Sequence, residues 1–211
     1  MSEKIVAWLD IADKLLLLLG VLFGFLLPTL IAPWIESRRD RIRDQKRVRS
    51  ALIQQLYLFF NVQKQHMKAL NYLEINARLE TFCREDHLTA KFEVDKKRTE
   101  EQYSKVREAR ANNWDEHVLL FDRMINIEAS ILGLLSEAKN IYPEDSYSQF
   151  DSIVKPQLHE ANHGRIRFYN YEKLTRHEIA KIQDTVGEKI YNKTLDLQKV
   201  CDGVIERIFD I

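Results

Sequence analysis

Glycine, proline and cysteine are scarce in this chain of 211 residues, which contains 6 glycines, 4 prolines and 2 cysteines. Neither glycine nor proline occurs between Pro33 and Gly133, and the absence of these breakers allows long uninterrupted helices. So few turn-forming residues argue against an all-β fold, while an apolar content of 45% argues against a disordered chain. We therefore predict an all-α protein.

Charge of one sign is also not in excess, because 32 basic side chains balance 32 acidic ones. A net charge of zero provides no overall field that would attract nucleic acid. Cys83 and Cys201 match no metal-binding or redox spacing, as expected in a thiol-reducing compartment. The sequence contains no glycine-rich phosphate loop and no nucleophile elbow, so it gives no support for nucleotide hydrolysis or common acyl transfer. We expect no cofactor.

A long apolar run near the N-terminus is the feature that stands out. Residues 15–35 carry no charge, and a helix of this length spans about 30 Å, the thickness of a bilayer's hydrocarbon core. We therefore predict a short amphipathic extracytoplasmic flank at residues 1–14, a transmembrane helix at 15–35 and a cytoplasmic domain at 36–211. The expected location is the inner (cytoplasmic) membrane of a bacterial-type cell, with the lipid bilayer as a partner.

Basic side chains directly after the run determine this orientation through the positive-inside rule. They are Arg38, Arg39, Arg41, Arg43, Lys46, Arg47 and Arg49. The same residues have a second interpretation, as a docking surface for anionic lipid headgroups. Asp40 and Asp44 interrupt the basic segment and can pair with Arg43 or Arg47 along a helix.

Two glycines and two prolines lie within the apolar run. Gly20 and Gly24 form a G-x-x-x-G pair, which predicts self-association because missing side chains let two helix backbones approach closely. The alternative interpretation is that these are ordinary glycines of a membrane helix. Pro28 and Pro33 can kink the helix and free carbonyl groups that a neighbouring helix or the Thr29 hydroxyl could satisfy.

The rest of the chain predicts an antiparallel bundle of helices. Apolar side chains recur every three or four positions over 52–77, over 118–135 and over 182–208. We expect a loose segment within 81–95, a charged helix over 96–110, a helix start at Asn113 or Asp115, and a loop at Pro143. The stripe over 182–208 can pack within the chain or pair between subunits.

One motif suggests metal chemistry. His159, Glu160 and His163 match H-E-x-x-H, the zinc-peptidase pattern in which two histidines one helical turn apart bind zinc and the glutamate activates its water. Gly164 and Arg165 follow at once, in place of the apolar continuation that is usual for such a helix. The alternative interpretation is a polar, solvated helix end.

A second pattern suggests RNA cleavage. Arg110 and His117, separated by six residues, resemble the Arg-to-His motif of HEPN ribonucleases, which are helical domains that dimerise around two such pairs. The resemblance implies that His117 acts as acid or base and that Arg110 stabilises the phosphorane. Ala111 follows the arginine where the family often has a polar residue. The alternative interpretation is a capping turn with an exposed His117.

The layout of an anchor followed by a helical domain resembles the small membrane-anchored accessory proteins of prokaryotic antiviral systems. One of these is the accessory membrane protein of type VI-B CRISPR loci, which has a degenerate HEPN-like domain. We therefore predict a non-enzymatic effector or scaffold that forms homo-oligomers, has a protein partner from the same system and forms a pore in one version. The alternatives are a tethered ribonuclease that uses Arg110 and His117, and a zinc peptidase that uses His159, Glu160 and His163.

Overall fold

A computed structural model describes residues 2–163 and 167–211, with the side chains of 2–7, 9–12, 26, 27, 30 and 159–163 outside the description. All regular secondary structure in these ranges is helical, which confirms the predicted all-α class. The elements are α1 (Ser2–Leu26), a π-helical turn (Leu27–Ile31), α2 (Ala32–Thr89), α3 (Glu93–Ile141), α4 (Glu144–His163), a 3-10 turn (Tyr171–Lys173) and α5 (Arg176–Phe209).

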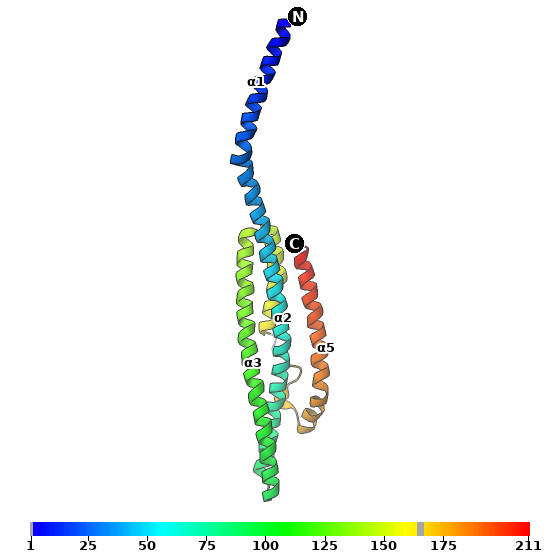
Figure 1. Ribbon diagram of the computed structural model, residues 1–211. Helices are drawn as coiled ribbons and strands as arrows, with labels where there is room; N and C mark the ends of the chain where they lie inside the picture. Colours follow the sequence, from blue (N-terminus) through cyan, green and yellow to red (C-terminus); the bar gives the residue numbers. More distant parts are fainter. Residues whose placement is uncertain (1, 164–166) are drawn as a thin grey trace. The chain divides into compact units, whose positions relative to one another are not determined.

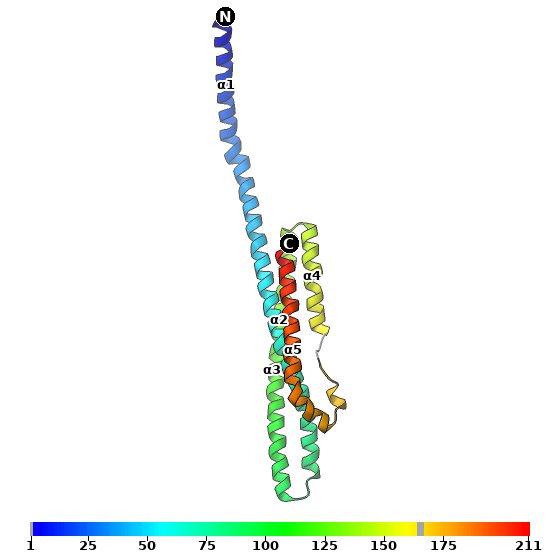
Figure 2. The ribbon, with the colours of Figure 1, turned by 90° about the vertical axis from the view of Figure 1, so that its right-hand side faces the viewer.

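The chain divides into two compact units, residues 1–47 and residues 48–211. In the second unit, α2, α3, α4 and α5 run alternately down and up, so that successive helices are antiparallel (Figures 1 and 2). The predicted helical bundle is therefore present in this unit.

The predicted single-pass membrane protein, with a transmembrane helix at residues 15–35, is contradicted. No helix of the described residues combines the length and the apolar character needed to cross a bilayer. The apolar run is divided among elements, because α1 ends at Leu26 and α2 begins at Ala32. The π-helical turn between them contains Pro28, which lacks the N–H of a regular helix turn. The predicted location in the inner (cytoplasmic) membrane is overturned together with the span.

The hydroxyl group of Thr29 lies at this interruption and donates a hydrogen bond to the Phe25 carbonyl. The sequence suggested that either a neighbouring helix or the Thr29 hydroxyl would pair with a carbonyl group near Pro28, and here the partner is Thr29. The contact explains how the backbone passes through the π-helical turn without leaving that carbonyl group unpaired.

Two apolar clusters hold the second unit together, and α2 and α5 contribute to both of them. The first joins one half of α2 and α5 to α3 and α4 and includes Leu52, Phe59, Met124, Ile131, Phe150, Val154, Val204 and Ile208. The second joins the other half of α2 and α5 to the 3-10 turn and includes Met67, Ile75, Phe82, Tyr171, Ile179, Val186 and Leu197. The stripe predicted over 182–208 is thus used within the chain.

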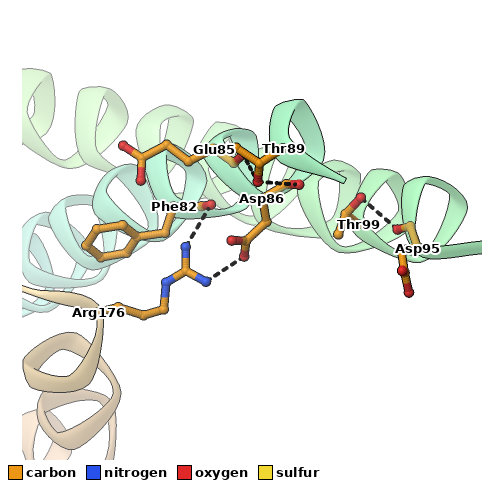
Figure 3. A network of polar contacts seen from close by, with 7 residues as sticks. All are labelled: Phe82, Glu85, Asp86, Thr89, Asp95, Thr99 and Arg176. Carbon is orange, nitrogen blue, oxygen red and sulfur yellow. Dashed lines mark hydrogen bonds and ion pairs between the residues drawn. The ribbon is translucent and has the colours of Figure 1, made fainter. Parts of the chain in front are cut away.

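Polar contacts fix the start of α5. The Thr175 hydroxyl accepts a hydrogen bond from the Glu178 N–H at 3.4 Å, and the Glu178 carboxylate accepts from the Thr175 N–H at 2.7 Å, which completes a capping box. Hydrogen bonds from the backbone and side chain of Thr175 lower the pKa of Glu178. Arg176 donates to the Asp86 carboxylate at 2.6 Å and to the Phe82 carbonyl at 3.1 Å (Figure 3). These bonds hold α5 against the end of α2.

Replacing a buried leucine of α3 with alanine is expected to cost far more stability than replacing an exposed one. Leu135 is 2% exposed and Leu119 is 68% exposed on the same helix. We expect Leu135→Ala to lower the free energy of unfolding by about 2–5 kcal/mol, because a cavity is left in the core. Leu119→Ala serves as the control and should cost less than about 1 kcal/mol. Urea denaturation followed by circular dichroism measures both, and equal losses would contradict the assigned burial.

Candidate functional site

Arg110 on α3 is the centre of the most developed polar site in the described part of the chain. Its guanidinium Nη1 lies 2.7 Å from the Glu80 carboxylate on α2, whose side chain is only 15% exposed. Two cavities lie next to this ion pair, and Arg110 lines both of them. Their volumes are about 350 Å³ and about 290 Å³, near the lower end of the range for small-molecule pockets.

The larger cavity is formed mainly by one face of α3. Its lining residues are Glu80, Arg107, Arg110, Ala111, Trp114 and Asp115. Arg107, Ala111 and Trp114 share a helix face because they are four and three positions apart. The two guanidinium groups are balanced by two carboxylates, so the cavity has no excess of either charge. No nucleophile with an adjacent base is among these lining residues.

The smaller cavity lies beside a hydrogen-bond network centred on Asn71, which is fully buried in α2. The Asn71 Oδ1 accepts hydrogen bonds from the Tyr171 hydroxyl at 2.7 Å and from the Phe168 N–H at 3.2 Å. Its Nδ2 donates to the Met67 carbonyl at 2.8 Å. This amide therefore fixes the segment before α5 to α2, and the Glu74–Arg167 ion pair at 2.6 Å fastens the same segment.

Tyr171 lines the smaller cavity with a pKa raised above its ordinary value. Burial is the main cause, and the nearby Tyr169 and Glu74 add to it. The neutral phenol is therefore favoured, as its role as a hydrogen-bond donor to Asn71 requires. This assigns Tyr171 a structural role in the wall of the cavity.

His117 has a different environment from Arg110, although both residues lie on α3. Its ring stacks on His66 of α2 with centroids 4.7 Å apart and planes 22° apart, and Trp114 and Phe121 lie next to it. The His117 Nδ1 is shielded from solvent. The structure thus places Arg110 in an ion pair and His117 in a ring stack. The ribonuclease roles of both residues stay a prediction.

The predicted zinc site falls on side chains that lie outside the described residues. His159, Glu160 and His163 belong to the last turns of α4, and Gly164 and Arg165 follow the end of that helix. Among the residues whose side chains are described, no group of three histidine, cysteine or acidic side chains is placed to hold a metal ion. The metal hypothesis therefore stays a prediction.

The residues predicted for oligomerisation lie on an open face of α1. A Cβ atom added at Gly20 or Gly24 would meet no atom within 4 Å. The surrounding side chains of α1 are apolar and exposed, including Leu16, Leu17, Val21 and Phe25. Close approach of another helix at these two glycines is therefore sterically possible.

The basic segment 38–49 divides into paired side chains, exposed side chains and one structural residue. Arg43 lies 2.8 Å from Asp40 and Arg47 lies 3.8 Å from Asp44, as the spacing suggested. Arg49 donates to the Phe209 carbonyl at 3.0 Å and so satisfies the C-terminal end of α5. In the described part of the chain, no ion pair involves Arg39, Arg41 or Lys46, and these three remain candidates for an anionic partner.

Sequence reasoning missed Glu80, Trp114 and Asn71 as parts of the site. Asn71 had a usable signal, because it is a polar residue next to Leu70 within an apolar stripe and a buried amide must be hydrogen-bonded. Glu80 had none, since its partner Arg110 comes from another helix. Trp114 shares a face of α3 with Arg107 and Ala111, so helical spacing was the signal that could have placed it.

Replacing Tyr171 with phenylalanine is expected to remove a pH dependence. In the folded chain Tyr171 keeps its proton above the ordinary phenol pKa of about 10, whereas the unfolded chain releases it there. Its contribution to stability is present below pH 10 and is lost as the pH rises. We expect the melting temperature of the wild type to fall more steeply than that of Tyr171→Phe between pH 9 and 11. Parallel curves in thermal melts would contradict this assignment.

Comparison of the chain with models of protein families, with curated proteins and with solved structures finds no match. The function is therefore argued from the geometry of the chain itself.

Proposed function

We propose that this chain is a non-enzymatic scaffold or effector that assembles into a homo-oligomer through α1. The observation that carries the proposal is the exposure of large apolar side chains around the whole circumference of this helix. They are Leu15, Leu16, Leu17, Leu18, Leu19, Val21, Leu22, Phe23 and Phe25, each between 44% and 69% exposed. Five consecutive leucines point in all directions at 100° per residue. Exposed apolar side chains of this extent are costly in water and favour association.

A second copy of α1 fits this surface because of the two glycines. Gly20 and Gly24 lie one turn apart on the same face, where open space surrounds both backbones. Two helices that meet at such a face come close enough for extensive van der Waals contact between their backbones. The leucine and phenylalanine side chains on either side then pack against those of the other copy.

The polar surroundings of Arg110 support a non-enzymatic role. Its charge is already balanced by Glu80 at 2.7 Å, and a phosphate would have to compete with that carboxylate for the guanidinium. RNA cleavage that disappears in both Arg110→Ala and His117→Ala would instead favour the ribonuclease alternative.

The resemblance to antiviral accessory proteins suggests the setting in which such a scaffold would work. In that setting, a partner from the same system would bind the assembled bundles, and Arg39, Arg41 and Lys46 offer it exposed basic side chains. The pore version required a membrane-crossing helix and is not retained.

Leucine substitutions at paired glycines test the proposal. We expect light scattering in detergent-free buffer to give a multimer for the full chain and a smaller species for Gly20→Leu/Gly24→Leu, because the added side chains keep the helices apart. Gly133→Leu/Gly187→Leu is the matched control, since these glycines are also helical and surrounded by open space. Its mass should equal that of the wild type.

Two results would overturn the proposal. One is an unchanged mass of the Gly20/Gly24 variant. The other is a monomeric wild type that sediments with phosphatidylcholine vesicles, which would mean that lipid, and not another copy, covers α1.

A further inference from the structure

Helix α3 has two apolar stripes, and only one of them belongs to the core. The buried stripe contains Leu120, Met124, Ile127, Ile131, Leu135 and Ala138. The other lies about 110° around the helix and contains Trp114, Val118, Phe121, Ile125 and Leu132, which are between 39% and 55% exposed. We call these five residues the exposed seam.

The spacing of the exposed seam is that of a coiled coil. Its members follow at intervals of four, three, four and seven positions, which are the a and d positions of a heptad repeat. Glu128 occupies the one heptad position between Ile125 and Leu132 that has no apolar side chain. A single polar residue in such a seam determines which register and orientation a partner helix adopts.

We propose that a second copy of this chain docks on the exposed seam, with the two α3 helices antiparallel. In a parallel pair, the two Glu128 carboxylates would face each other in one layer, and like charges in contact repel. In an antiparallel pair, Glu128 of each copy lies opposite Val118 of the other. The same register places Trp114 opposite Leu132 and Phe121 opposite Ile125, so every large ring meets an aliphatic side chain.

The extent of the seam fits an interface between two copies. At 39–55% exposure, its five side chains leave about 400 Å² of apolar surface on each copy, judged from the size of such side chains. A standard interface buries about 800 Å² on each partner, with an apolar centre and a polar rim. The exposed seam supplies the centre, and the polar side chains beside it supply the rim. This docking uses a different surface from α1 and does not depend on how α1 assembles.

Cross-linking of the full chain tests the orientation. Trp114 and Leu132 lie about 27 Å apart along one helix, too far for a short bis-maleimide to bridge within a chain. We expect Trp114→Cys/Leu132→Cys to give a covalent dimer, because each new cysteine faces the other one in the partner. Either single variant should give no more dimer than the wild type, whose Cys83 and Cys201 set the background.

The controls separate specific pairing from random collision and from misfolding. Leu119→Cys is 68% exposed but off the seam, and it should stay at background. Glu128→Leu removes the charge repulsion that disfavours the parallel pair, so it should raise the cross-linked fraction of the single-cysteine variants above background. Efficient cross-linking of the single variants that retain Glu128 would show another orientation and overturn the proposal, as would a double variant that retains native helicity and stays at background.

Discussion

The bundle depends on the packing of α2 against α5, because these two helices are the only described elements with several residues in both apolar clusters. Phe59 and Val204 lie in the first cluster, while Ile75 and Ile179 lie in the second. Helix α3 and α4 complete the first cluster, and the segment before α5 closes the second. The hydrogen bonds of Asn71 and Arg176 are directional. They help to set the position of α5 along α2, which apolar packing alone specifies less strictly.

The two packed helices were also the most predictable part of the fold. In the sequence, Leu52, Leu56 and Phe59 follow a helical period, and all three are buried. In α5 the period placed Val200 on the apolar stripe, because Val200 lies three positions after Leu197 and four before Val204. The structure buries Cys201 and leaves Val200 44% exposed. Periodicity finds the stripe, but the packing partner decides which neighbour enters it.

The positions where helices start, end or break were less predictable. Asn113 and Asp115 suggested a helix start, yet α3 continues from Glu93 to Ile141 without a break. Pro156 lies inside α4, where buried Val154 and Leu158 hold the helix to the core on either side of it. Local capping and breaking signals are worth about 1–3 kcal/mol each, so burial of a long apolar face overrides them. At Pro28 the described side chains, including Phe25 and Ile31, are exposed, and a π-helical turn divides the apolar run.

The site around Arg110 could not be derived from sequence for a related reason. The spacing of Arg110 and His117 suggested two residues that act together, but each of them has a different partner on α2. Glu80 balances the charge of Arg110, and His66 stacks on His117. A pair of residues on one helix is thus assigned to two separate environments by the helix that packs beside it.

The distribution of apolar surface links the fold to the proposed function. The described core satisfies the buried stripes of α2, α3 and α5, but it leaves α1 and the exposed seam of α3 in contact with solvent. Each surface has a feature that would influence how another copy binds. The glycines of α1 permit close approach of a second helix, and Glu128 of α3 disfavours a parallel pair. Exposed apolar side chains arranged in this way favour association, and further copies of the same chain could cover both α1 and the exposed seam.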